Sequence, residues 1–106
     1  TVLKGIPGCP GVQEGIAHLV SDPSELDTVK EGEILVCKMT NPAWVVSFSK
    51  ISALVTDTGG ALSHPAVVAR EFGVPCVVGT RRATQLIKTG DKIRVDGSIG
   101  VVEVLS

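Results

Sequence analysis

Short apolar runs separated by glycine and proline recur along the chain and predict strands. The runs have the length of single strands and are rich in Val, Ile and Leu, which fit buried sheet positions. We expect strands at residues 12–20, 33–38, 51–56, 74–78, 92–96 and 100–105. The segment 4–11 (Lys-Gly-Ile-Pro-Gly-Cys-Pro-Gly) is punctuated by Gly and Pro. We expect it to be a tight turning segment without regular structure.

Short helices are predicted where proline and glycine mark the two ends of a segment. Pro65 suits the first turn of a helix and Gly73 suits the position just past its end. Asn41-Pro42 gives the same start signal, because Asn can cap a helix. We expect one helix at 65–72, and a short one that starts at Asn41-Pro42 and runs through Trp44, Val45 and Phe48. A third is expected at 83–88, and a loop or short helical turn at 21–23.

The order of these elements predicts an α/β fold in a single domain covering residues 1–106. The middle reads strand, loop, helix, strand, which favours a parallel pair joined by a crossover helix. The last two strands are expected to form a hairpin through Asp96-Gly97. A mixed sheet, or two stacked sheets, with helices on one side is therefore expected.

Composition excludes several classes of partner. Hydrophobic residues make up 43% of the 106 residues, and no apolar run is long enough to span a membrane. The net charge of −1 and the 3% of aromatic residues argue against nucleic acid or a membrane surface. The three cysteines (Cys9, Cys37 and Cys76) are an odd number with no close pair in the sequence, which favours free thiols in a reducing cytoplasm. No signal peptide is visible, and a start at Thr1 suggests an excised domain.

The chemistry of the chain is concentrated at His64. A strand ends at Thr56, Gly59 and Gly60 follow, and His64 stands where an apolar helix begins. Backbone N–H groups and the dipole of a helix favour an anion at such a point. A neutral imidazole can attack phosphorus and form a phosphohistidine. If Pro65 is the first helical residue, His64 occupies the cap position.

Two further residues could assist such a site. The Ser63 hydroxyl is a possible donor to phosphate oxygens, and Arg70 could reach phosphate or order the loop by a salt bridge. A single histidine after two glycines could also be merely structural or part of a simple turn. The joint pattern of strand, glycine pair, Ser-His and proline-opened helix favours an anion site with a nucleophile.

Other polar residues have plainer interpretations. His18 lies in an expected strand without a paired carboxylate motif, so we interpret it as structural. Arg81 and Arg82 could attract a phosphate, but a solvated pair at a helix start is the simpler interpretation. No cluster of His, Cys and carboxylates predicts a metal centre, and no nucleotide-binding glycine motif is present.

The glycine loop and the helix after it resemble a known family. The run is Thr56-Asp57-x-Gly59-Gly60-x-x-Ser63-His64-x-Ala66-x-Val68-Ala69-Arg70-Glu71-x-Gly73-x-Pro75-x-Val77-Val78-Gly79. It resembles the mobile domain of phosphoenolpyruvate-utilising enzymes, which include phosphoenolpyruvate synthase, pyruvate phosphate dikinase, enzyme I and rifampicin phosphotransferase. The closing Gly90-Asp91-x-Ile93-x-Val95-Asp96-Gly97-x-x-Gly100 is similar to the end of that domain.

The resemblance implies a swivelling domain of β, β and α layers in which His64 carries phosphate between distant sites. Gly59, Gly60 and Ser63 would shape its loop. A separate ATP-grasp domain would phosphorylate the histidine, and a phosphoenolpyruvate- or pyruvate-type domain, or another acceptor domain, would exchange the phosphoryl group. These partners could lie in the same polypeptide or in another subunit. ATP and Mg²⁺ would bind there, so this chain would hold no cofactor and would be a component of a phosphotransferase.

Two positions depart from the pattern of some relatives. Leu62 stands where the dikinases have a regulatory threonine, and Pro65 replaces a small residue. Two other functions stay open: a non-catalytic interaction or regulatory module with the same fold, and a domain that binds a small anion without covalent chemistry.

Overall fold

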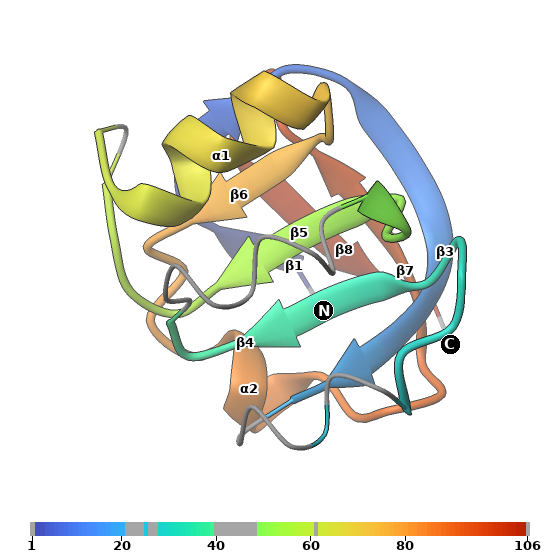
Figure 1. Ribbon diagram of the computed structural model, residues 1–106. Coiled ribbons are helices and arrows are strands. Elements are labelled where there is room, and N and C mark those ends of the chain that lie inside the picture. The colour runs from blue at the N-terminus through green and yellow to red at the C-terminus, as the bar shows by residue number, and fades with distance from the viewer. Residues whose placement is uncertain (1, 21–24, 26–27, 40–48, 61, 106) are drawn as a thin grey trace.

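The computed structural model describes residues 2–20, 25, 28–39, 49–60 and 62–105. Figure 1 shows a small domain in which strands surround a core and a helix covers one face. The elements are β1 (Val2–Lys4), β2 (Ile6–Cys9), β3 (Val12–Leu19), β4 (Ile34–Cys37), β5 (Ala53–Thr56), α1 (His64–Phe72), β6 (Cys76–Val78), α2 (Ala83–Leu86), β7 (Lys92–Asp96) and β8 (Val101–Val104).

The strands follow the order β1-β8-β7-β3-β4-β5-β6-β2. Strands β3, β4, β5 and β6 are parallel neighbours, and the other pairs are antiparallel. The first part of β3 pairs with β7 and the last part with β4, so one long strand passes from one half of the sheet to the other. The predicted parallel pair with a crossover helix (β5, α1, β6) and the predicted hairpin (β7, β8) are both confirmed.

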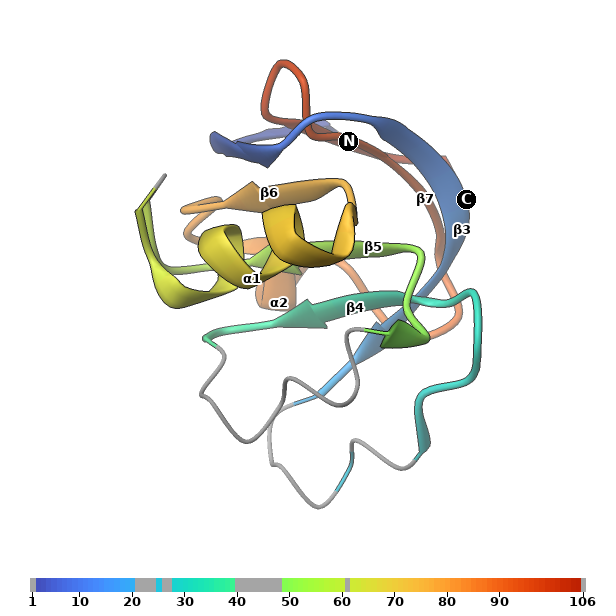
Figure 2. The same cartoon turned by 45° about the horizontal axis from the view of Figure 1, so that its top comes forward.

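The parallel strands form the middle layer because both of their faces are apolar. On one face, residues such as Leu35 and Leu54 pack with Ala66 and Ala69 of α1. On the other, residues such as Val36 pack against the half of the sheet that contains β7 and β8. Figure 2 shows α1 in front of β5 and β6, and β7 beside β3 at the right. The predicted α/β fold with β, β and α layers is therefore confirmed.

The second helix departs from the expectation that the helices lie on one side. The short α2 contributes Ala83 to the cluster on the face opposite α1, and Ile87 just beyond it joins the same cluster. Four residues are too few to cover a sheet, so α2 fills the end of the space between the two halves of the sheet.

The prediction for residues 4–11 is wrong in part, since two strands occupy most of this segment. Strand β1 pairs with β8, and β2 pairs with β6 at the other end of the strand order. Gly5 alone joins them, and a Cβ atom there would lie 2.5 Å from the carbonyl oxygen of Val78. Only glycine permits the chain to pass so close to another backbone. The glycines that suggested a turn instead allow close packing of strands.

The ends of α1 are close to those predicted. Gly73 adopts the left-handed conformation (φ 68°), and its N–H bonds to carbonyl groups of the last turn. The start is one residue earlier than expected, because Ser63 occupies the cap position and His64 is the first helical residue. The expected turn at 21–23 and nearly all of the helix predicted from Asn41-Pro42 lie outside the described residues.

The two ends of the chain lie in neighbouring strands. Val2 of β1 stands opposite Glu103 of β8. The C-terminal end lies on the side of the molecule opposite the start of α1 (Figure 1).

Candidate functional site: the loop before the first helix

The loop leaves β5 through a buried carboxylate. Asp57 is 6% exposed, and its two oxygens accept hydrogen bonds from Thr84, one from the backbone N–H (3.0 Å) and one from the hydroxyl (2.5 Å). A buried charge is tolerated when hydrogen bonds replace its water. Asp57 therefore fastens the end of β5 to the start of α2. The sequence motif contains Asp57, but nothing in the sequence indicated that Thr84 is its partner.

The next residues of the loop are held from both neighbouring strands. The N–H and the hydroxyl of Thr58 donate to the carbonyl of Lys38, which follows β4, at 3.0 and 2.9 Å. The N–H of Gly79, which follows β6, donates to the carbonyl of Thr58 at 3.3 Å. The loop thus begins from a fixed base at the carboxyl edge of the parallel strands, where ligands of α/β sheets commonly bind.

The two glycines of the loop differ in what the fold requires of them. Gly59 has φ of 104°, and a Cβ atom there would lie 2.7 Å from the hydroxyl oxygen of Ser63. Gly60 is not among the residues with positive φ, and a Cβ atom there would meet nothing within 4 Å. Gly59 is therefore needed for the shape of the loop, whereas the described surroundings leave open space at Gly60.

Ser63 closes the loop onto the helix. Its N–H and its hydroxyl both donate to the carbonyl of Gly60, at 3.0 and 2.6 Å. The hydroxyl makes no cap hydrogen bond to the helix. In this arrangement the hydroxyl proton of Ser63 is directed at the loop itself.

His64 opens the helix and is half-buried, while Pro65 behind it is buried. Leu62, two residues before His64, is 88% exposed. The imidazole therefore stands at the positive end of the α1 dipole, close to an apolar side chain that water surrounds. A phosphoryl group on this ring would benefit from the dipole by about 0.3–1 kcal/mol.

Arg70 has a described contact away from the loop. Its Nε–H donates to the carbonyl of Gly8 in β2 at 2.7 Å, which joins α1 to the edge of the sheet. The role toward phosphate considered for Arg70 stays a prediction.

Three thiols lie in the core beneath α1. Burial, with the neighbouring charge of Asp57 as a lesser cause, raises the pKa of Cys37 from 9.0 to about 12. Burial likewise raises the pKa of Cys76 to about 12, and Cys9 stands opposite Cys76 between β2 and β6. The absence of a close pair in the sequence thus did not exclude a close pair in the fold. Neutral, buried thiols are poor nucleophiles, so nothing here marks the cysteines as reactive.

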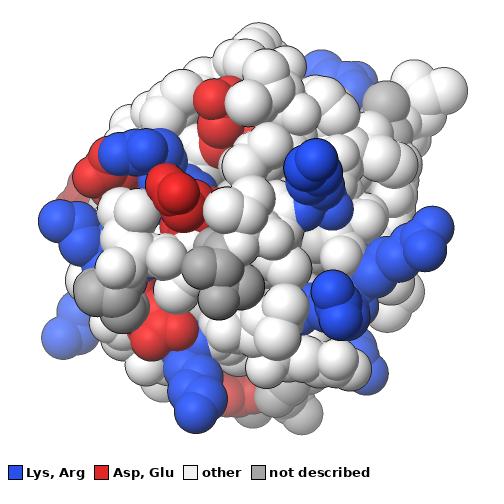
Figure 3. Space-filling model, turned by 180° about the vertical axis from the view of Figure 1, so that it is seen from behind, with Lys and Arg blue, Asp and Glu red and all other residues white. Residues whose placement is uncertain are grey.

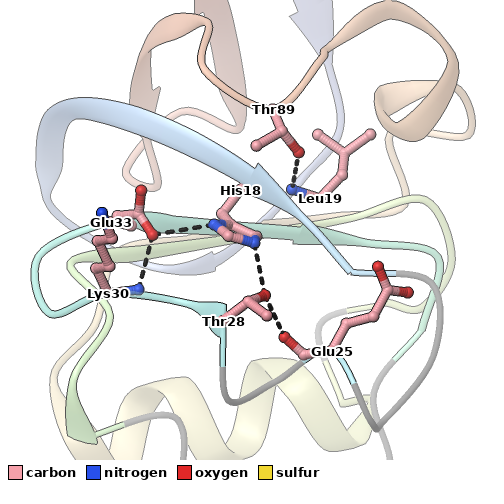
Figure 4. Close-up of polar contacts among 7 residues, drawn as sticks. All are labelled: His18, Leu19, Glu25, Thr28, Lys30, Glu33 and Thr89. Atoms are coloured by element: carbon pink, nitrogen blue, oxygen red, sulfur yellow. Dashed lines mark hydrogen bonds and ion pairs between the residues drawn. The ribbon is translucent and has the colours of Figure 1, made fainter.

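His18 has the carboxylate partner that the sequence did not reveal. Its Nδ1 lies 3.0 Å from Oε1 of Glu33, and its Nε2 lies 2.9 Å from the hydroxyl of Thr28 (Figure 4). The same Glu33 oxygen accepts the N–H of Lys30 at 2.7 Å. These contacts fasten the segment before β4 to β3, which supports a structural role for His18. Fifteen residues separate His18 from Glu33, so no local motif could have indicated the pair.

The described residues offer neither a metal site nor a membrane span. No group of three His, Cys, Asp or Glu side chains there could hold a metal ion. None of the described helices is long and apolar enough to cross a membrane.

The family of the chain is established by comparison. Residues 29–100 match the family described as "PEP-utilising enzyme, mobile domain", which covers the glycine loop, His64 and α1. The chain belongs to this family of mobile domains. The resemblance drawn from the sequence is confirmed.

Its relatives are much longer proteins. The chain is 50% identical over 103 residues to a probable phosphoenolpyruvate synthase of Staphylothermus marinus, covering 95% of this chain and 12% of that protein. It is 44% identical over 104 residues to a rifampicin phosphotransferase of Streptomyces sviceus, covering 98% of this chain and 12% of that protein. In these relatives the domain therefore sits in a polypeptide with much additional sequence.

Solved structures show the same architecture. A solution structure of an enzyme I protein matches 74% of this chain and 33% of that chain, with a TM-score of 0.65 and 32% identity. Aconitase X of Thermococcus kodakaraensis matches all of this chain and 99% of that chain, with a TM-score of 0.76 and 24% identity. The second likeness concerns the fold alone.

Proposed function

We propose that this chain is a phosphohistidine carrier domain and that His64 is the carrier. The observation that supports this most directly is the position of His64 as the first residue of α1, on a loop whose base is fixed by Asp57 and Thr58. The relatives named as a synthase of phosphoenolpyruvate and a rifampicin phosphotransferase agree with phosphoryl transfer.

The chemistry has two steps. The lone pair of a ring nitrogen of neutral His64 attacks the phosphorus of a donor, the bond from phosphorus to the leaving oxygen breaks, and that oxygen keeps the electron pair. The acceptor then attacks the same phosphorus, and the ring nitrogen recovers its lone pair. Two transfers through a covalent intermediate allow donor and acceptor to stay in separate sites.

The partners belong to this proposal as well. We expect an ATP-grasp domain with ATP and Mg²⁺ as the donor site, and a phosphoenolpyruvate- or pyruvate-type domain, or another acceptor domain, as the second site. This chain supplies the carrier and is not a complete enzyme alone.

Intact-mass analysis after treatment with phosphoramidate tests the role of His64. The chain has two histidines, so His18→Gln is a matched control for His64→Ala. We expect one acid-labile phosphoryl adduct on the wild type and on His18→Gln, and none on His64→Ala. An adduct that survives in His64→Ala contradicts the proposal. A folded wild type that takes no adduct favours the alternative, a non-catalytic interaction or regulatory module with this fold.

A further inference from the structure

The charges of the chain are divided unevenly between its parts. Residues 34–90 contain six Lys or Arg and two Asp or Glu, a net charge of +4, whereas the remaining residues contain four basic and nine acidic residues, a net charge of −5. Figure 3, seen from behind, shows acidic and basic side chains mixed on its left side and basic side chains alone on its right side. That right side is the left side of Figure 1, toward which the arrowheads of β4, β5 and β6 point.

Three exposed cations follow the ends of these strands. Lys38 comes directly after β4, and Arg81 and Arg82 come shortly after β6. Because β5 lies between β4 and β6, Lys38 lies on one side of the loop that follows β5 and the two arginines lie on the other. We call Lys38, Arg81 and Arg82 the cationic rim. None of the three pairs with a carboxylate of the described residues. Asp57 is a buried carboxylate at this edge, bound by Thr84, and one carboxylate against three cations leaves the rim a surplus of positive charge.

The backbone at Arg81 supports a selected role for this side chain. Arg81 has φ of 71°, and it is the one non-glycine residue with positive φ in the described part of the chain. Its N–H donates to the carbonyl of Asp57 at 2.9 Å, so the turn is fixed to the same loop base. Glycine would adopt this conformation without strain, whereas the Cβ atom of any other residue crowds the following carbonyl oxygen. A strained residue beside a candidate site is a reason to test it for function.

We infer that the cationic rim attracts the anionic phosphoryl donor to His64 and, after transfer, stabilises the charge of the phosphoryl group. This rests on the proposed carrier function and deepens it, because it assigns part of the donor recognition to the carrier domain itself. The helix dipole provides a partial positive charge at the start of α1. The rim adds full positive charges on both sides of the glycine loop. The ligand class is a phosphate-bearing anion.

The test measures the rate of phosphorylation of His64 by phosphoramidate at low and high salt. Raising salt from about 0.01 M to about 1 M shortens the Debye length from about 30 Å to about 3 Å. Arg81→Gly/Arg82→Gln removes two charges of the rim and also relieves the strained backbone, so misfolding is not the expected consequence. Lys30→Gln/Lys92→Gln removes two exposed charges elsewhere that, like the rim, pair with no carboxylate of the described residues, and is the matched control. Arg81→Lys/Arg82→Lys restores the charge.

We expect a wild-type rate that falls about eightfold with salt, since each of the three rim cations contributes roughly twofold at low salt. The charge-removed variant should start about fourfold slower at low salt and fall only about twofold with salt, because Lys38 remains, while the control and the lysine variant should behave like wild type. If wild type and Arg81→Gly/Arg82→Gln show equal rates and equal salt responses, the proposed role of the rim is wrong. His64 then remains the carrier, and the two arginines are a solvated pair. A folded wild type that takes no adduct contradicts the carrier proposal, and with it the proposed role of the rim.

Discussion

Replacing Asp57 by Ala should weaken the domain strongly, although the residue is not the proposed carrier. The substitution removes two hydrogen bonds, 3.0 Å from the N–H and 2.5 Å from the hydroxyl of Thr84, and leaves that N–H without its acceptor. Hydrogen bonds to a charged group contribute about 1.5–3 kcal/mol each, so a loss of about 3 kcal/mol in the free energy of unfolding is a low estimate. With an unfolding entropy of about 2.1 cal/mol/K per residue, the 106 residues give a fall in Tm of about 13 °C.

Thr84→Val provides the matched comparison, because it removes the hydroxyl bond and keeps the bond from the backbone N–H. We expect a fall in Tm of about 7 °C for this variant, from a loss of about 1.5 kcal/mol, the lower value for one hydrogen bond to a charged group. In Asp57→Ala/Thr84→Val the shared bond is lost only once, so the combined loss should be smaller than the sum of the single losses.

Thermal unfolding followed by circular dichroism measures all four proteins. A fall in Tm of less than about 4 °C for Asp57→Ala would refute the estimate, given a loss of about 3 kcal/mol. Strict additivity in the double variant would show that Asp57 and Thr84 do not act through each other.

Two further predictions concern glycines and thiols. Gly97→Ala should lower the free energy of unfolding in urea by more than about 3 kcal/mol, because its Cβ atom would collide with the carbonyl oxygen of Cys9. Gly60→Ala has open space around its Cβ atom and should change that free energy by less than about 1 kcal/mol. A tolerated Gly97→Ala would contradict the packing. Burial raises the pKa of Cys37 from 9.0 to about 12, so the unfolded chain loses this proton first and stability should fall as pH rises from 9 to 12. The urea midpoint should therefore fall less steeply across this range in Cys37→Ala than in wild type, and equal slopes would disprove the effect.

Local patterns predicted the part of the fold that surrounds His64. Pro65 and Gly73 marked the ends of α1 to within one residue, since caps depend on neighbours in sequence. The strands β4 and β5 were found as short apolar runs, because both faces of a middle layer are buried.

The features that the sequence missed all depend on distant partners. Strand β2 carries Pro7 and Gly8, which indicate a turn, yet it is held by pairing with β6 about seventy residues away. Asp57 and Thr84 meet across 27 positions. Propensity and spacing contain no information on such pairs, so the base of the candidate loop could be described only from the three-dimensional arrangement.

The pairing of the first strand with the last one determines how the domain can be attached to a longer chain. Because Val2 lies opposite Glu103, both connections would leave from neighbouring points on the surface. Two tethers at one place act like a single pivot, whereas tethers at opposite ends would resist rotation. The start of α1 lies on the side away from the C-terminal tether (Figure 1), and the longest dimension of the domain is 30 Å. If the domain turned on such a pivot, the start of α1 would move further than the parts of the domain next to the tethers.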